Sequence, residues 1–117
     1  MLQDLRRSDP MLQAFKKALE NPKVVGRAYA PQTVKNYHWH VEHFMKYCRA
    51  NDTTPQAIPR HKIQKYLKAL WLEVKRKEKS SSSFLQTCTS LELFYRTVGE
   101  DLKRADQIPV LRVEVSA

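Results

Sequence analysis

Glycine, cysteine and long apolar runs are scarce in this 117-residue chain, and each scarcity excludes a class of structure or site. The two glycines, Gly26 and Gly99, lie too far apart for a glycine-rich phosphate loop, and no GxSxG or Walker pattern occurs. The two cysteines, Cys48 and Cys88, form no CxxC pair and fall on apolar helix faces, which predicts free, buried thiols. No segment holds the roughly 20 apolar residues of a membrane span, and the first residues do not resemble a secretory signal. A reducing, cytoplasmic location without membrane contact is expected.

Residues that could perform chemistry are also sparse. Only 12 acidic residues accompany 21 Lys and Arg, and they are scattered, so no paired-carboxylate site is predicted. His38, His40 and His43 lie close together, but on a helix they point in different directions and lack the HExxH order of a zinc site. The serine run from Ser80 to Ser83 has no nearby histidine in the sequence to act as its base. We therefore expect no enzyme activity, no metal and no cofactor.

The positive charge is abundant and concentrated. The chain carries a formal net charge of +9, and residues 60–79 alone hold eight Lys or Arg against two acidic residues. A localised basic stripe of this kind is typical of proteins that bind a polyanion. A solvated helix with a lysine-rich outer face has the same composition, so charge alone leaves both interpretations open.

Apolar residues recur at helical spacing almost throughout, which predicts an all-α fold. Four helices are expected, at about 9–20, 31–49, 59–77 and 82–98. Leu102 continues the apolar face of the fourth, so an extension to about residue 104 stays open. Short joins and one apolar face per helix predict a compact bundle of four to five helices with orthogonal or bundle-like packing. Residues 105–117 alternate briefly like a strand without a partner, and are expected to be extended.

The expected helix starts at Pro31 and in the serine run Ser80–Ser83 have a similar small-polar character. The other helix ends also carry local signals. Asp9 and Pro10 are the expected cap and first residue of the first helix, and Gly99 suits the position after the fourth. One of the serines before the fourth helix is expected to cap it. Trp39 lies opposite the apolar stripe of its helix, and we expect the first helix to cover it, because a lone exposed tryptophan is uncommon.

Three segments, in chain order, resemble the N-terminal core-binding domain of tyrosine recombinases, the family of phage and integron integrases. They are Thr33-x-x-x-Tyr37-x-x-x-Val41-x-x-Phe44, Ile58 with Ile63-x-x-Tyr66-Leu67, and Ser82-Ser83-Phe84 with Leu91 and Phe94-Tyr95. The resemblance covers about residues 30–98. It implies a SAM-like helical domain that forms the small half of a clamp around duplex DNA, with the catalytic residues of the family in a separate C-terminal domain.

The resemblance also implies a division of the chain. Residues 1–29 would be an N-terminal helix and connector, residues 30–104 a helical DNA-binding core, and residues 105–117 an extended tail or the start of a linker to a catalytic domain that this chain lacks. The implied function is double-stranded DNA binding as the non-catalytic N-terminal module of a site-specific recombinase, in DNA integration and recombination. The implied partners are duplex DNA and other recombinase protomers assembled on it, with the chain alone a monomer.

Candidate DNA contacts come from two helix starts and one basic turn, because a helix N-terminus offers free N–H groups and a positive dipole to phosphate. They are Arg27, Gln32, Thr33, Lys35, Asn36, Lys75, Arg76, Lys77, Lys79, Ser82, Ser83, Gln86 and Thr87. For the serines, helix capping is an equal alternative. A different function is a helical protein–protein adaptor that uses the apolar residues outside the core stripes: Trp39, Leu72, Leu85 and Leu93. A metal-dependent hydrolase that uses the histidines is a third and weaker hypothesis.

Overall fold

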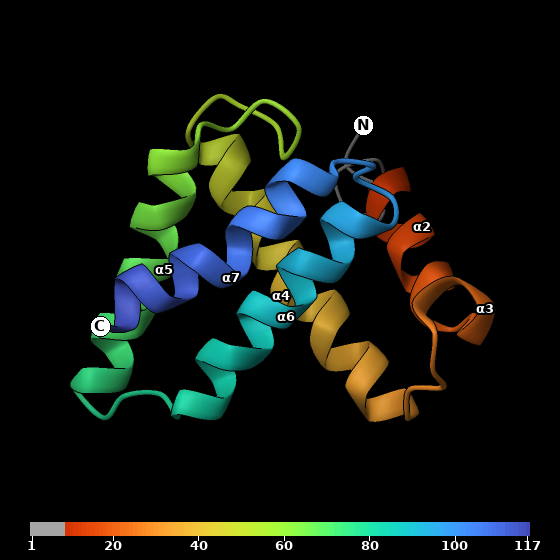
Figure 1. Cartoon of the computed structure of the whole chain (residues 1–117), viewed down its shortest axis with the longest axis horizontal. Coiled ribbons are helices and arrows are strands. Elements are labelled where there is room, and N and C mark those ends of the chain that lie inside the picture. The colour runs from red at the N-terminus through yellow and green to blue at the C-terminus, as the bar shows by residue number, and fades with distance from the viewer. Residues whose placement is uncertain (1–8) are drawn as a thin grey trace, which may run out of the picture.

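Six helices follow one another in the computed structural model, which describes residues 9–117 (Figure 1). They are α2 (Pro10–Leu19), α3 (Pro22–Val25), α4 (Pro31–Ala50), α5 (Arg60–Lys75), α6 (Ser81–Arg96) and α7 (Leu102–Ser116). No strand occurs between residues 9 and 117, so the predicted all-α class is confirmed. Residues 1–8 of the predicted N-terminal segment lie outside the described residues.

The ends of the first helices follow from local sequence. A side-chain oxygen of Asp9 accepts a hydrogen bond from the Met11 N–H at 2.8 Å, and Pro10 takes the first helical position, as predicted. The connector after α2 contains the short helix α3, which was not predicted. Asn21 caps it, and Gly26 ends it in the left-handed conformation with φ 77°, where a side chain would be strained.

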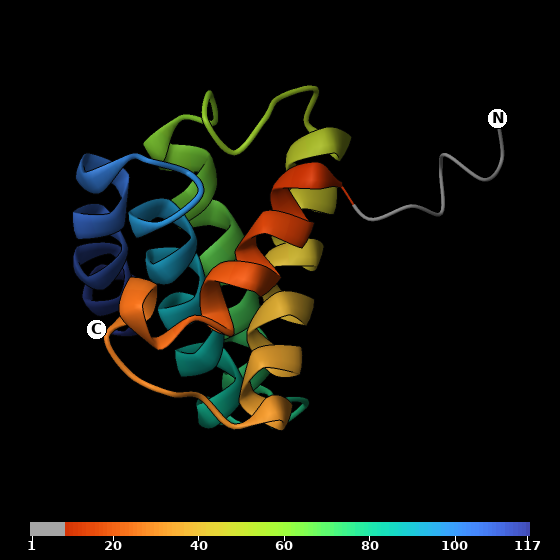
Figure 2. The same cartoon turned by 90° about the vertical axis from the view of Figure 1, so that its right-hand side faces the viewer.

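The core lies where α4 and α6 cross (Figure 1). Phe44 of α4 and Tyr95 of α6 are fully buried with their ring centroids 6.4 Å apart. Helix α2 reaches the same core through Phe15, whose ring meets Phe94 edge-on at 5.7 Å. Figure 2 shows α6 between α4 on one side and α7 on the other. The helices therefore form one core in which α4 and α6 hold fixed positions relative to each other.

The C-terminal region differs from the prediction. The segment expected to be extended is the helix α7, which packs on α5 and α6 and buries Ala105, Ile108 and Leu111. These residues are three apart and share a helical face, which the short alternation of apolar residues obscured. The helix includes Pro109, which removes one backbone hydrogen bond from its interior.

Helix α6 does not extend to residue 104 but ends at Arg96, before a tight turn into α7. The left-handed residue of this turn is Glu100, with φ 48°, and not Gly99 as expected. Glycine is favoured at position 99 for a different reason: a Cβ there would approach the Tyr95 Cα to 3.0 Å, a tight contact with backbone. The turn after α6 therefore packs closely onto the last residues of that helix.

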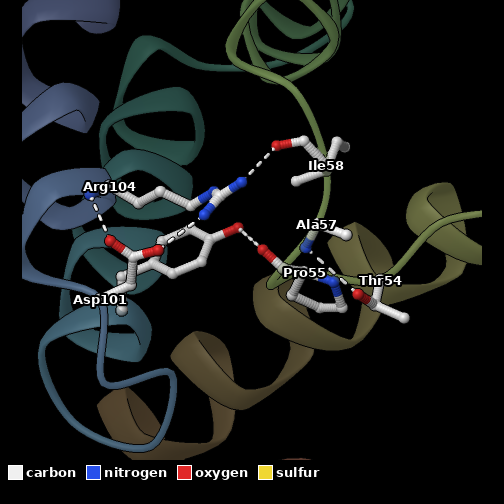
Figure 3. A network of polar contacts seen from close by, with 7 residues as sticks. Thr54, Pro55, Ala57, Ile58, Asp101 and Arg104 are labelled. Carbon is white, nitrogen blue, oxygen red and sulfur yellow. Dashed lines mark hydrogen bonds and ion pairs between the residues drawn. The ribbon is translucent and has the colours of Figure 1, made fainter.

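A polar network joins this turn to the loop between α4 and α5 (Figure 3). The Arg104 guanidinium donates to the Ile58 carbonyl at 2.9 Å and to an Asp101 carboxylate oxygen at 2.6 Å. The buried Tyr95 hydroxyl donates to the Pro55 carbonyl at 2.7 Å. The two loops at this end of the molecule are therefore held together, and the starts of α4 and α6 lie at the other end (Figure 1).

Candidate nucleic-acid interface

The two helix starts singled out in the sequence lie side by side along one edge of the molecule, with a gap between them (Figure 1). The N-terminal ends of α4 and α6 and the C-terminal end of α5 all lie at the bottom of Figure 1, and Figure 2 shows the same grouping from the side. The loop of residues 76–80, which links α5 to α6, runs along this edge. We call this region the helix-start edge, defined by residues 27–36 and 75–86. It contains the N-terminal turns of two helices and the most basic part of the chain.

At the start of α4, the N-cap residue Ala30 supplies no side-chain hydrogen bond, so no cap side chain occupies the first N–H groups of the helix. Gln32 donates from Nε2 to the Asn36 Oδ1 at 2.9 Å, one turn further along. This bond leaves the Gln32 carbonyl oxygen and the Asn36 amide group for other partners. Lys35 is exposed, whereas Thr33 is half-buried.

Two further cations flank this start. Arg27, in the connector before α4, is exposed, and its guanidinium lies 5.1 Å from the centre of the Tyr29 ring. That contact orients the guanidinium without neutralising it, because the partner is an uncharged ring. Lys35 forms no ion pair with another described residue.

The loop between α5 and α6 presents Lys75, Arg76, Lys77 and Lys79, all exposed. Lys77 adopts a left-handed conformation with φ 62°, which turns the chain sharply after α5. Arg76 is paired with Glu78, with Nε and Oε2 3.3 Å apart. Three lysines and one partly neutralised arginine therefore surround the start of α6.

At the start of α6, Ser80 is the cap: its Oγ accepts a hydrogen bond from the Ser83 N–H at 3.2 Å. The prediction that one serine caps this helix is confirmed. Ser82 is exposed, while Ser83 and Gln86 are half-buried. These three side chains remain candidates for contact with a partner at the helix-start edge.

Thr87 does not belong to an accessible surface, and its prediction as a contact is wrong. It is buried where α4 and α6 cross, and its hydroxyl donates to the Ser83 carbonyl at 3.0 Å. Because a hydroxyl has a single proton, the His40 Nδ1, also 3.0 Å away, must be the donor to the Thr87 oxygen. Burial lowers the pKa of His40 below its ordinary value of 6.5. Thr87 and His40 thus join the two helices that form the edge.

Trp39 also departs from expectation. Helix α2 lies along the side of α4 that carries Val34 and His38, and leaves Trp39 46% exposed. The Trp39 and His43 ring centroids lie 3.7 Å apart with the ring planes tilted by 33°, and both residues line a cleft of about 240 Å³ between α4, α5 and α6. The sequence analysis named Trp39 only for the adaptor hypothesis and His43 only as a histidine of the hydrolase hypothesis, and listed neither as a DNA contact, although their place opposite the apolar stripe was a signal.

The two thiols and the hydroxyls of Tyr66 and Tyr95 lie largely or fully out of contact with solvent. Cys48 and Cys88 are free and buried, as predicted, and burial raises the pKa of the first thiol to about 11 and of the second to about 12. Burial likewise raises the pKa of the Tyr66 and Tyr95 hydroxyls. Among residues 9–117, no group of three His, Cys, Asp or Glu is placed to hold a metal ion. None of the described helices is both long and apolar enough to span a membrane.

A comparison with known families agrees with this arrangement. A family model described as "Phage integrase, N-terminal SAM-like domain" matches residues 11–104, from α2 into the first turn of α7. The matched region contains the whole helix-start edge and most of the core. Comparisons with curated proteins and with solved structures gave no match. Since the match covers most of its length, the chain belongs to the family of phage integrase N-terminal SAM-like domains.

Proposed function

We propose that this domain binds double-stranded DNA as the non-catalytic N-terminal module of a site-specific tyrosine recombinase or integrase. The observation that carries the proposal is the grouping of two helix N-termini and a basic loop at the helix-start edge. Family membership supports it independently. Other recombinase protomers, bound to the same DNA in the cytoplasm, are the proposed protein partners, and the domain alone is proposed to be a monomer.

The proposed binding mode places the starts of α4 and α6 against the DNA backbone and the major groove. The uncapped N–H groups of α4, together with Ser82 and Ser83 of α6, suit phosphate oxygens. Gln32 and Asn36 have the amide groups that read adenine in the major groove. Gln86, half-buried at the second turn of α6, would reach the groove only where the first turn is close to the backbone.

The basic residues would supply the affinity that does not depend on sequence. Five exposed cations at the helix-start edge form no ion pair with another described residue: Arg27, Lys35, Lys75, Lys77 and Lys79. If each neutralises one phosphate, log K should fall with log salt at a slope of about −4 to −5. Binding should be weak in absolute terms, because a clamp around DNA needs a second half.

The protein–protein adaptor hypothesis receives less support from the structure. It needs a continuous apolar surface, yet Trp39, Leu72 and Leu85 line three separate hollows. Leu93, the fourth residue of that hypothesis, is partly buried against the core. Single exposed apolar residues are normal on soluble proteins and do not by themselves mark a partner site.

A charge-reversal experiment tests the proposal. The double variant Lys77→Glu, Lys79→Glu is compared with Lys65→Glu, Lys68→Glu, which changes the charge equally on exposed positions in the middle of α5. Fluorescence anisotropy with a labelled duplex of about 20 base pairs should show a much larger loss of affinity for the first pair. Equal losses would mean that only net charge matters, and would contradict an interface at the helix-start edge.

A further inference from the structure

One face of α4 carries polar and aromatic side chains well beyond the helix start. Gln32, Asn36, Trp39 and His43 follow one another at intervals of four, three and four residues, so they lie on a single helical face. At 1.5 Å per residue this face is about 16 Å long. Its first two members are proposed DNA contacts, and its last two form the stacked aromatic pair.

The pair has a defined hydrogen-bonding state. The His43 Nδ1 lies 3.0 Å from the Trp39 carbonyl oxygen. A carbonyl only accepts hydrogen bonds, so Nδ1 is the donor, and the tautomer that fits this contact leaves the Nε2 lone pair free to accept. The Trp39 ring, stacked on His43 at 3.7 Å, is restrained while 46% of the residue stays exposed. The face thus ends in a rigid apolar surface beside a hydrogen-bond acceptor.

The charges around the pair favour an anionic partner. Lys35 and Lys46 of α4 are exposed on either side of Trp39 along the helix, and Lys79 lines the opposite wall of the cleft. Glu73 of α5 lines the same cleft, and Glu42 follows Trp39 by three residues on α4. Three cations outnumber these two acidic residues, and the face continues directly from the helix-start edge, so duplex DNA fits this surface better than an apolar protein does.

We propose that Trp39 and His43 extend the DNA interface along α4. Trp39 makes apolar contact with a thymine methyl group or the adjacent deoxyribose in the major groove. His43 accepts, through Nε2, a hydrogen bond from the exocyclic amino group of adenine or cytosine, the two amino donors of that groove. This inference rests on the proposed duplex binding and adds two specific contacts to it.

Trp39 contributes little to the core, which makes it a clean reporter. The other tryptophan, Trp71, is half-buried with its ring centroid 5.1 Å from that of Phe84. A chain labelled with 5-fluorotryptophan therefore gives two ¹⁹F resonances from two different environments. The Trp71→Phe variant serves only to assign them, so the measurement itself uses the unsubstituted sequence.

The experiment adds a duplex of about 20 base pairs to the labelled chain, with binding followed separately by anisotropy. Saturation should shift the Trp39 resonance and reduce its paramagnetic broadening by a dissolved neutral nitroxide at least twofold, while the Trp71 resonance should change less. An unchanged Trp39 resonance at full saturation would overturn this inference and leave duplex binding intact. No anisotropy change at low salt would overturn the proposed function and this inference with it.

Variants test the energetic importance of the pair. Trp39→Ala should weaken duplex binding about 5- to 10-fold, whereas Leu102→Ala, an exposed apolar residue at the far end of the molecule, should leave it unchanged. In selection from a randomised duplex library, His43→Ala should lose a preference for adenine or cytosine at one position. His43→Gln, which keeps an acceptor, should retain it. If the unsubstituted protein, His43→Ala and His43→Gln all select the same sequences, the proposed role of His43 is refuted.

Discussion

Glu78 is the acidic residue in the basic loop of the helix-start edge, and its replacement by glutamine should strengthen DNA binding. The Arg76–Glu78 pair is about 60% exposed on both sides, so it contributes only about 0–1 kcal/mol to stability. Glu78→Gln frees the Arg76 guanidinium as a sixth phosphate contact beside the five cations that form no ion pair within residues 9–117. At about −0.9 per contact, the salt slope should change from about −4.5 to about −5.4. Binding at 0.1 M salt should tighten about eightfold if the constants converge near 1 M.

The assay is anisotropy with a 20-base-pair duplex across a salt series. Glu100→Gln is the matched control, because it removes one exposed negative charge in the turn at the opposite end of the molecule. The control should change affinity far less, and both variants should melt within a few degrees of the unsubstituted protein. An unchanged slope for Glu78→Gln, or equal effects of the two substitutions, would refute the assignment of this loop to the DNA interface.

Three further predictions concern the contacts that hold the interface helices. Thr87→Val removes the buried acceptor of the His40 Nδ1–H and should lower the free energy of unfolding in urea by about 1–3 kcal/mol; no loss would show that the bond is not formed. Tyr95→Phe leaves the Pro55 carbonyl unpaired and should cost about 1–2 kcal/mol in the same assay, and a neutral result would contradict the network. Burial lowers the pKa of His40 in the folded protein, so below about pH 6.5 the unfolded chain binds more protons than the folded one. The free energy of unfolding should therefore decrease as the pH is lowered from about 7.5 to about 5.5, and it should decrease less in His40→Gln.

Much of the fold could be predicted because its longest helices are strongly periodic. Helices α4, α5 and α6 begin and end within two residues of their predicted bounds, where Pro31, Pro59 and the serine run mark their starts. Such signals are local and do not depend on the rest of the chain. The small-polar starts of α4 and α6 could likewise be recognised, although only the structure shows that both lie along one edge (Figure 1).

The remaining features depend on tertiary packing and could not be predicted. Helix α7 is stabilised by burying Ala105, Ile108 and Leu111 against α5 and α6. The local sequence of residues 105–117 does not show that α5 and α6 offer a surface for this face. Thr87 was assigned to an accessible helix start, but the crossing of α4 over α6 buries it. Trp39 was expected to be covered, but α2 packs against a different side of α4.

The most direct test of the proposed interface is a titration of the ¹⁵N-labelled domain with a 20-base-pair duplex, followed by amide chemical shifts. We expect the perturbed amides to cluster at residues 32–43 and 75–86, and the amides of α7 to remain unchanged. The shifts at the helix-start edge should reverse when salt is raised, since counterion release drives binding. Perturbations centred on α7, or no saturable shifts at low salt, would contradict DNA binding through this edge.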